Sequence, residues 1–358
     1  MTIWPDRCSL DLLGIELPIV QAPMAGAVTS AMVIAVAEAG GLGSLPCAIL
    51  SMDQIRTELS TVRGRTSKPV NMNFFCHRPP SIDAAREAAW RRRLKPYYVE
   101  LGLDPEMATK TPAIEPFGSA HCALVEELKP EVVSFHFGLP DKDLLARVKK
   151  TGAKILSSAT TVKEARWLEE NGCDAIVAQG AEAGGHRGTF LSDDISTQPG
   201  TLALVPQVVD TVGLPVIAAG GIADARGIVA AFALGASAVQ IGTSYLFCPE
   251  AHVAPAHREA LAAGGADQTV LTNIFSGRPA RVILNRIVRE LGAISELAPP
   301  FPLAGGGLGP LRAKSEPSGS ADFIPLWAGE AARLGRALPA GELTRRLAKE
   351  ALAKLAVL

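Results

Sequence analysis

The stretches VIAAGGI (residues 216–222) and AVQIGT (residues 238–243) decide the fold that this chain is predicted to adopt. Each begins with a short apolar run, which is typical of a buried parallel strand, and each run stops at glycine. Asp224 and Gly235 bracket an apolar helical segment between them, so together they form a strand–helix–strand unit. Taken singly, a Gly-Gly pair would only mark a tight turn.

The same unit recurs through the first two-thirds of the chain. Short apolar runs alternate with amphipathic helical segments, as a parallel sheet with helical crossovers requires. The predicted strands are residues 19–21, 42–45, 70–74, 132–135, 154–156, 175–178, 216–218 and 238–241. Eight such pairs predict the α/β class and a (β/α)8 TIM barrel, with an open doubly wound sheet as the alternative. In a barrel the loops after the strands share one face, where the chemistry takes place.

The helix ends carry their own signals. Thr161 precedes a helical segment at residues 162–171, and Glu164 follows three residues later, which predicts a capping box. Gly172 is placed to end that helix in the left-handed conformation. Because these signals agree with the strand pattern, they support the alternation.

Two regions depart from the repeating unit. Residues 79–116 contain a basic helical segment and are expected to lengthen the third crossover. Residues 248–323 include Pro299-Pro300 and the run Gly305-Gly306-Gly307, which predicts a helical and loop-rich cap. We therefore expect a barrel made of residues 1–247 and 324–358, with the cap inserted between them and a helix near the C-terminus.

Composition narrows the range of partners. Lys and Arg number 35 and Asp and Glu number 36 in 358 residues, so charge gives no reason to expect nucleic acid or an anionic membrane surface. The uncharged run at residues 227–249 is interrupted by polar residues and glycine and is interpreted as buried core rather than a membrane span. Six scattered cysteines without a CxxC pair disfavour disulfides and a metal site and favour a reduced, cytoplasmic setting. A small-molecule partner is expected, and a homodimer is compatible with the sequence.

The chemistry is expected at the ends of the strands. Glycine at 220, 221 and 242 could bring backbone N–H groups to a phosphate, and no GxxxxGK[ST] pattern points to a nucleoside triphosphatase. After the sixth strand, the stretch QGAEAGGHRG (residues 179–188) surrounds His186 with glycine. Bare backbone can accept a flat ligand, and an imidazole can remove a proton near neutral pH, so His186 is the leading candidate for catalysis.

Further candidates follow other strands. His136 and His77 could line the pocket or could be hydrogen-bonded interior residues. Asn71 and Asn73 alternate along one strand, so only one faces the barrel centre, and Asn73 lies nearer the active end. Residues 22–24, Ala22-Pro23-Met24, suit contact with a flat heteroaromatic ring. Cysteines 47 and 76 lack basic neighbours and are interpreted as structural.

With these residues assembled, the chain resembles the nitronate monooxygenases, formerly called 2-nitropropane dioxygenases, in the class that carries an NFFCH segment (residues 73–77). The stretch from Gln179 to His186 is the most specific part of this resemblance. The matching stretches span most of the chain and are residues 18–26, 73–77, 179–188, 218–222, 240–243, 277–281, 285–286 and 323–329.

The resemblance implies a barrel that binds FMN without a covalent bond. Its phosphate would lie over Gly220, Gly221 and the loop Gln240-Ile241-Gly242-Thr243, and its ring would lie among Ala22, Pro23, Met24, Asn73, Gln179 and Gly184. His186 matches the base proposed for the family, and His136 matches a second histidine near the substrate. The implied reaction oxidises an alkyl nitronate, such as propionate 3-nitronate, with O2 to nitrite and a carbonyl compound.

Two departures and three alternatives accompany this resemblance. Residues 282–284 (VIL) replace a smaller stretch, and Tyr245 adds a phenol after the phosphate loop that could reach the pocket. An FMN-dependent NAD(P)H:quinone or enoyl-thioester reductase would use the same barrel. A relative of inosine monophosphate dehydrogenase would need a cysteine in the loop after the sixth strand, which this chain lacks. A non-catalytic binder of a phosphate ligand is the alternative from another class.

Overall fold

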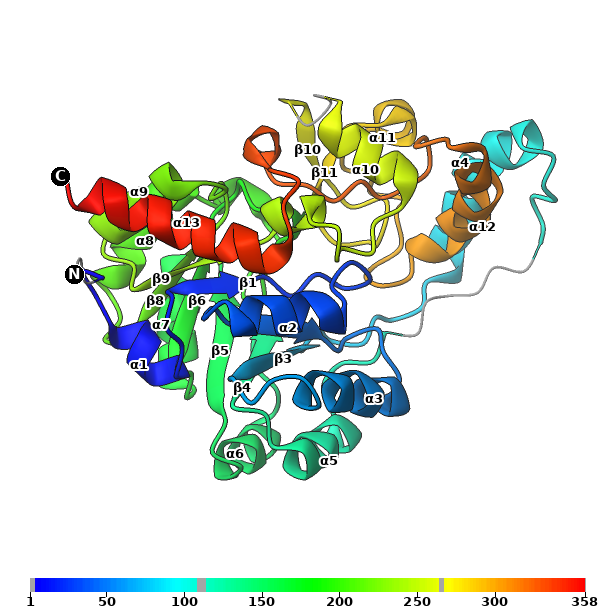
Figure 1. Ribbon diagram of the computed structural model, residues 1–358. Coiled ribbons are helices and arrows are strands. Elements are labelled where there is room, and N and C mark those ends of the chain that lie inside the picture. Colours follow the sequence, from blue (N-terminus) through cyan, green and yellow to red (C-terminus); the bar gives the residue numbers. More distant parts are fainter. Residues whose placement is uncertain (1–3, 108–113, 264–266, 358) are drawn as a thin grey trace.

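The computed structural model describes residues 4–107, 114–263 and 267–357, and eight parallel strands form its centre (Figure 1). They run in the order β1-β9-β8-β6-β5-β4-β3-β2. Their bounds are β1 (Ile19–Gln21), β2 (Gly43–Pro46), β3 (Val70–Phe75), β4 (Val132–His136), β5 (Lys154–Ala159), β6 (Ala175–Gln179), β8 (Val216–Ala219) and β9 (Ala238–Ile241).

The sheet closes on itself through β1 and β2. Val20 forms a parallel bridge with Leu42, the N–H of Gln21 donates to the Leu42 carbonyl, and the N–H of Leu42 donates to the Ile19 carbonyl, both at 2.9 Å. The barrel prediction is confirmed, and the open doubly wound sheet is wrong. Each predicted strand is present, because the apolar runs that mark it are buried on both faces.

Helices surround the strands (Figure 1). Their bounds are α1 (Cys8–Leu13), α2 (Ser30–Glu38), α3 (Met52–Arg63), α4 (Ala84–Glu100), α5 (Ser119–Leu128), α6 (Lys142–Lys150), α7 (Val162–Glu170), α8 (Thr201–Val209), α9 (Ala225–Ala233), α10 (Pro255–Ala262), α11 (Arg286–Leu291), α12 (Gly305–Ser315) and α13 (Ala340–Leu355). The predicted cap of α9 is present, since the Asp224 carboxylate accepts from the N–H groups of Arg226 and Gly227. In Figure 1, α13 lies beside α2 and α9 and covers the outside of the barrel.

One cap differs from its prediction. The Thr161 side chain accepts from the N–H of Glu164, as expected, and Gly172 adopts a φ of +98°. However, the Glu164 carboxylate does not return to Thr161. It accepts from the N–H and hydroxyl of Thr160 at 2.7 and 2.6 Å, so the predicted capping box is only half formed.

Beyond the barrel, residues 248–323 contribute two strands to a second sheet that the sequence pattern did not predict. Strands β10 (Thr269–Thr272) and β11 (Ala280–Ile283) form an antiparallel hairpin, and β11 also pairs with β7 (Gly185–His186). Ala280 lies opposite His186 in this register. The cap is therefore bonded directly to the loop that carries the leading catalytic candidate.

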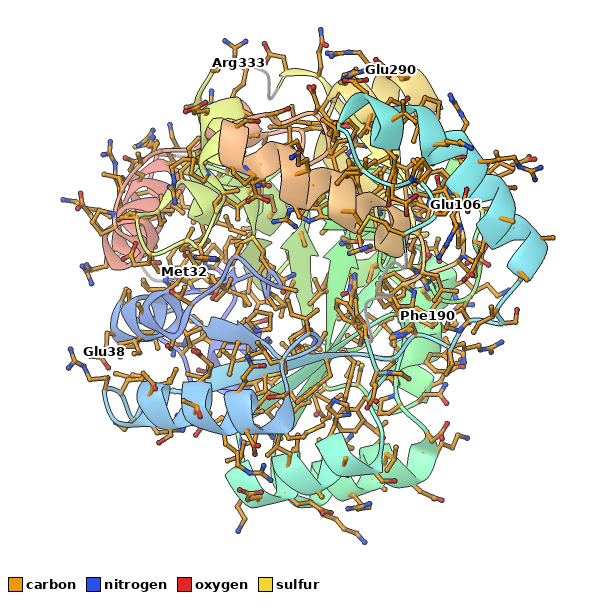
Figure 2. All side chains as sticks on the ribbon, turned by 90° about the vertical axis from the view of Figure 1, so that its right-hand side faces the viewer. Met32, Glu38, Glu106, Phe190, Glu290 and Arg333 are labelled. Atoms are coloured by element: carbon orange, nitrogen blue, oxygen red, sulfur yellow. The ribbon has the colours of Figure 1, made fainter. Side chains whose placement is uncertain are left out.

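The glycine run at 305–307 starts helix α12 rather than a loop. A Cβ added at Gly307 would lie 2.8 Å from Leu94 Cδ1 in α4, so glycine lets the two helices pack closely. Trp90 Nε1 donates to the Ala304 carbonyl at 3.2 Å, and the Tyr98 hydroxyl donates to the Gly307 carbonyl at 2.7 Å. Figure 2 shows α4 and α12 above the barrel strands on the side that faces the viewer.

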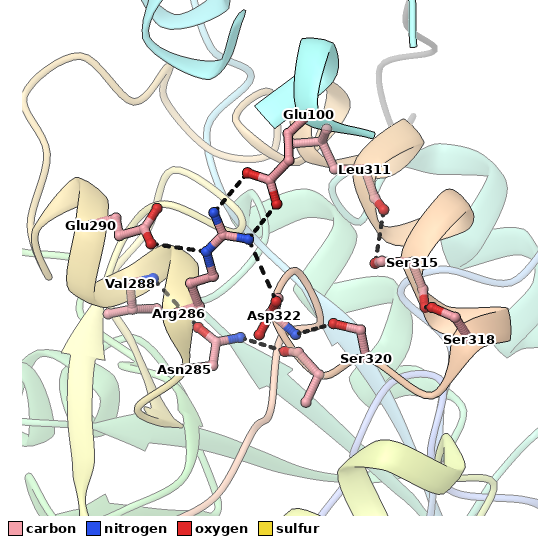
Figure 3. A network of polar contacts seen from close by, with 11 residues as sticks. Glu100, Asn285, Arg286, Val288, Glu290, Leu311, Ser315, Ser318, Ser320 and Asp322 are labelled. Atoms are coloured by element: carbon pink, nitrogen blue, oxygen red, sulfur yellow. Dashed lines mark hydrogen bonds and ion pairs between the residues drawn. The ribbon is translucent and has the colours of Figure 1, made fainter. Parts of the chain in front are cut away.

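An ion-pair network also fastens α4 to the cap (Figure 3). The Arg286 guanidinium donates to both carboxylate oxygens of Glu100 at 2.6 and 2.7 Å, and to Glu290 at 2.8 Å. Asp322 lies 3.7 Å from the same guanidinium. Because α4 belongs to the third crossover, this network joins segments nearly 190 positions apart. Within the described residues, no helix is long and apolar enough to cross a bilayer.

Candidate active site

A cavity of about 360 Å³ opens at the carboxyl ends of the barrel strands. It is lined by residues within β3, β4, β5, β6, β8 and β9, by residues that follow β1, β6, β8 and β9, and by residues of the segment 248–323. The predicted residues among them are Ala22, Pro23, Met24, Asn73, His136, Gln179, Gly184, His186, Gly220, Gly221, Gln240, Gly242 and Thr243. A volume of this size falls in the range of small-molecule sites. Segments scattered over more than 200 positions therefore meet at one face.

Glycine shapes one end of this cavity. Gly220 and Gly221 have φ angles of +106° and +69°, which side chains rarely adopt, and a Cβ on Gly220 would lie 2.9 Å from the Thr201 hydroxyl. In the described part of the chain, the N–H groups of Gly221, Ile222 and Gly242 donate to no other residue. Unpaired N–H groups that line a cavity are suited to an anion such as phosphate.

Glu182 is the one carboxylate among the described lining residues, and it is already engaged. Its two oxygens accept from the Thr201 N–H at 2.9 and 2.8 Å, and one also accepts from the Thr201 hydroxyl at 2.9 Å. Thr201 is the first residue of α8, so the carboxylate caps a helix N-terminus. This contact offsets its charge at the glycine-lined end.

The loop that carries His186 is held by Gln179. The Gln179 side chain donates to the His186 carbonyl at 3.0 Å and accepts from the Gly188 N–H at 2.8 Å. Arg187, which is fully buried, donates to the carbonyls of Gln179 and Gly180. Both side chains form hydrogen bonds with backbone groups of this loop, so the His186 ring projects from a rigid loop.

Among the described residues, the His186 ring has no acidic hydrogen-bond partner. Its Nε2 lies 2.9 Å from the Ser276 hydroxyl, and the rings of Phe75, Phe301 and Trp327 surround it at centroid distances of 6.5, 5.4 and 5.3 Å. Burial, and after it the positive charge of Arg278, lowers the pKa of His186 to about 3. The imidazole is therefore neutral throughout the physiological pH range.

His136 lies beside it at the end of β4. Its Nδ1 lies 2.8 Å from the Ser158 hydroxyl, and burial, then His186, then Arg278 lower the pKa of His136 to about 3. The following residue, Phe137, has a φ of +70°, an uncommon conformation for a bulky side chain that is typical of functional sites. Two neutral imidazoles thus face one cavity.

Comparisons with known proteins agree with this geometry. The nitronate monooxygenase family model matches residues 7–350. A curated nitronate monooxygenase from Pseudomonas aeruginosa is 44% identical over 349 residues, covering 95% of this chain and 97% of the relative. The chain belongs to the nitronate monooxygenase family.

Solved structures extend the comparison. Nitroalkane oxidase from Streptomyces ansochromogenes is 37% identical with a TM-score of 0.88, and the match covers 98% of this chain and 100% of that one. FabK from Thermotoga maritima is 28% identical with a TM-score of 0.74, covering 99% and 98%. Both similarities extend over the whole barrel and cap, so the family relationship is not confined to the glycine turns.

For this member of the nitronate monooxygenase family, some predicted positions lie elsewhere. Ile241 does not line the cavity, because successive strand residues face opposite sides and its side chain packs in the main core. Tyr245 does not reach the pocket either. It is fully buried and its hydroxyl pairs with Thr344 of α13 at 2.8 Å. His77 also lies outside the lining, where its Nε2 pairs with the Ile114 carbonyl at 3.1 Å.

The asparagine prediction places the right residue. Asn73 lines the cavity and donates to the Ser134 hydroxyl at 2.9 Å, whereas Asn71 donates to the Ser44 hydroxyl away from the cavity. Cysteines 47 and 76 have thiol pKa values raised, chiefly by burial, which fits a structural role.

Sequence reasoning missed the residues that surround the imidazoles. Phe75, Phe301 and Trp327 come from three distant segments, and Ser276 and Arg278 come from the turn between β10 and β11. The resemblance had marked residues 73–77, 277–281 and 323–329 as matching stretches, which include Phe75, Arg278 and Trp327, without giving these three side chains a role. That match was the only available signal, because no local spacing links these residues to His186.

Proposed function

We propose that this chain is an FMN-dependent nitronate monooxygenase of the cytoplasm. It oxidises alkyl nitronates, such as propionate 3-nitronate, with O2 and releases nitrite and a carbonyl compound. The observation that carries the proposal is the neutral His186, held over a glycine-lined cavity in a chain that shares 44% identity with a curated nitronate monooxygenase.

The residues present fit FMN. The unpaired N–H groups of Gly221 and Gly242 suit the phosphate, and the small or apolar residues 22–24 suit one edge of a flat ring. Bound there, the flavin supplies an electron acceptor and the chemistry with O2. A Cβ on Gly242 would lie 3.5 Å from the Ala22 Cβ and 3.7 Å from the Met24 sulfur, so Gly242 lies directly beside the residues proposed to contact the ring.

The protein's own groups favour an ionised substrate. Hydrogen bonds engage the Glu182 carboxylate beside Gly221, and the positive charge of Arg278 acts on both imidazoles. An anionic substrate that binds near the imidazoles therefore meets a positive potential. A neutral imidazole whose pKa is so low is a weak base, so His186 removes a proton from a neutral nitroalkane inefficiently. This is why we assign the nitronate, rather than the nitroalkane, as the main substrate.

We also propose that residues 248–323 act as a substrate cap over the barrel formed by residues 1–247 and 324–358. Support comes from the cavity lining, which includes His252, His257 and Arg312 of this segment. The cap also carries the strand that pairs with His186. Water exclusion by such a cap strengthens the electrostatic contacts beneath it.

The test begins with the purified protein. It should be yellow and should release FMN on denaturation. Mixing it anaerobically with propyl nitronate should bleach or redden the flavin within seconds, and admitting O2 should then release nitrite. A colourless protein that cannot be reconstituted with FMN would contradict the cofactor assignment.

The same experiment separates the reductase alternative. Reduced nicotinamide, added anaerobically in place of the nitronate, should reduce the flavin slowly or not at all. Fast reduction by NADH or NADPH with no response to the nitronate would assign the chain to the quinone or enoyl-thioester reductases instead.

A further inference from the structure

The turn between β10 and β11 contacts His186 through Ser276 and carries Arg278 toward both imidazoles. We propose that this turn is the positioning element of the site: Ser276 fixes His186 as the tautomer protonated on Nε2, and Arg278 keeps the ring neutral, so that Nδ1 presents its lone pair to the substrate. This inference rests on the proposed function, because it names the atom through which His186 acts.

Counting hydrogen bonds decides the tautomer. The Ser276 hydroxyl has one proton and lies 3.2 Å from the Arg278 carbonyl, which can only accept. The hydroxyl oxygen also accepts from the Arg278 N–H at 3.3 Å and lies 2.9 Å from His186 Nε2. If Ser276 donates to the carbonyl, Nε2 must carry the proton and donate to Ser276, and the hydroxyl and both backbone groups of Arg278 are then paired.

The opposite tautomer leaves groups unpaired. A Ser276 hydroxyl that donated to Nε2 would abandon the Arg278 carbonyl, which accepts from no other described residue. The proton on Nδ1 would then have no acceptor, since Nδ1 contacts no hydrogen-bonding group in the described chain. A polar group left without a partner where water is excluded costs about 1–3 kcal/mol, so loss of the hydrogen bond to the Arg278 carbonyl disfavours this tautomer. Nδ1 is therefore the free lone pair, on a ring that lines the cavity.

Arg278 supplies a fixed positive charge nearby. Its guanidinium carbon lies 4.2 Å from the centre of the Phe137 ring, it donates to the carbonyl and hydroxyl of Thr189, and its Nε is buried without a partner. Arg278 forms no ion pair with any described residue, and the carboxylates of Asp193 and Glu164 act on it only from farther away. Its charge is thus largely uncompensated.

The other groups around His186 do not offset this charge. The rings of Phe75, Phe301 and Trp327 are uncharged, and His136 on β4 is itself neutral, with a pKa lowered to about 3. A positive charge beside an imidazole opposes its protonation, so Arg278 adds to the effect of burial. The turn therefore sets both the tautomer and the charge of the ring.

Nitrogen NMR on the FMN-loaded full chain tests the tautomer directly. With 15N-labelled histidine, and with His186 assigned by comparison with the His186→Asn variant, the wild type should show a proton on Nε2 and an unprotonated Nδ1. Ser276→Ala should lose this single-tautomer pattern, and Ser276→Thr, which keeps the hydroxyl, should retain it. Ser158→Ala is the matched control, because it removes the hydroxyl from His136 and should alter that ring's signals while His186 keeps its tautomer.

A pH titration of the same signals tests Arg278. Arg278→Met should move the His186 midpoint upward by about one pH unit or more, the scale of a nearby like charge. Arg278→Lys should restore a low midpoint, and Arg289→Met, which removes an exposed charge from the same cap, should leave it unchanged. In kinetics, Ser276→Ala should lower kcat for a neutral nitroalkane about tenfold with little change in KM.

Two results would overturn the proposal. One is a wild-type His186 that carries its proton on Nδ1. This observation is made on the wild type alone, so it does not depend on whether a variant folds. The other is a midpoint that Arg278→Met does not move. Nitrite release tests the proposed function separately, so an inactive protein with the stated tautomer would refute the function and leave this inference standing.

Discussion

His186 differs from most histidine bases in what supports it. A catalytic histidine is commonly oriented by a carboxylate, which stabilises the imidazolium and raises its basicity. Here the partner of Nε2 is the Ser276 hydroxyl, and the nearest fixed charge is the cation of Arg278. The ring is well oriented and poorly basic, a combination that suits a substrate that is already an anion.

This combination predicts a substrate-dependent effect of His186→Asn. Turnover of a neutral nitroalkane should fall about tenfold, less than the 10²–10⁴-fold scale of a well-matched general base, whereas turnover of the preformed nitronate should change little. Initial rates of nitrite release with the two ionisation forms, at a pH where both persist, measure the difference. FMN should remain bound, because the glycine turns are untouched. An equal loss with both forms would exclude a role for His186 in proton transfer.

For individual residues, the sequence predicted the placement of side chains next to a strand end. It did not predict contacts between segments that are far apart in the chain. Gly220, Gly221 and His186 directly follow strands, so their placement followed from the strand pattern. Ser276 lies 90 positions from His186, and its contact depends on how the β10–β11 hairpin folds over the barrel. Ile241 does not line the cavity, and the family match gave its position without saying which way its side chain faces.

Among the secondary-structure elements, α7 shows how one side chain can serve two connections. The buried Glu164 carboxylate accepts from Thr160 with one oxygen and from the N–H groups of Phe190 and Leu191 with the other, at 2.7 and 3.2 Å. It therefore ties the start of α7 to the loop that follows His186. A capping box would have used the same residue only within its own helix.

Glu164→Gln should consequently lower the free energy of unfolding through contacts that lie outside the cavity. The amide has one acceptor where the carboxylate has two, so N–H groups lose their charged partner, at about 1.5–3 kcal/mol for each hydrogen bond. Urea unfolding should show a lower midpoint, and hydrogen exchange should be faster at Phe190 and Leu191. Glu170→Gln, an exposed change on the same helix, is the control. Unchanged exchange in the loop would show that the carboxylate does not hold it.

The secondary-structure elements differ in how clearly the sequence pattern predicts them. The barrel strands were predicted because each is a short apolar run between turn residues, repeated in step with helices. The β10–β11 hairpin was missed because seven residues separate its strands and no two-residue turn signal marks it. The glycine run at 305–307 only indicated a helical and loop-rich region, and it begins a helix because close packing of α12 against α4 favours glycine there.

In the whole molecule, residues 248–323 pack against a helix from a distant part of the chain. Helix α4 comes from the third crossover, yet Trp90, Leu94 and Tyr98 share a core with Leu308 and Phe323 of the cap. The Arg286 network reinforces the same junction (Figure 3). Nothing in either segment's sequence indicates a contact with the other segment. The sequence therefore showed that both depart from the strand–helix repeat, but it did not predict that they pack together.

Across the whole molecule, most histidines are held in the neutral form. Burial is the first cause that lowers the pKa of five of the six, to about 3 or 4 where a value is defined. They are His77, His121, His136, His186 and His257. In the unfolded chain each would titrate near its ordinary pKa of about 6.5. As the pH falls below that value, the unfolded state binds protons that the folded state does not, so acid favours unfolding.

The free energy of unfolding should therefore drop steeply as the pH falls from about 6.5 toward 4.5, before carboxylates with ordinary pKa values titrate. Each histidine contributes a slope of up to about 1.4 kcal/mol per pH unit, which is large against a typical stability of about 5–15 kcal/mol. Urea unfolding at several pH values, with and without FMN, measures that slope. His186→Asn removes one titrating group and should make the slope shallower by roughly one histidine's share, whatever it does to stability at pH 7. A stability that stays level from pH 7 to pH 5 would mean that these imidazoles bind protons in the folded protein as readily as in the unfolded chain.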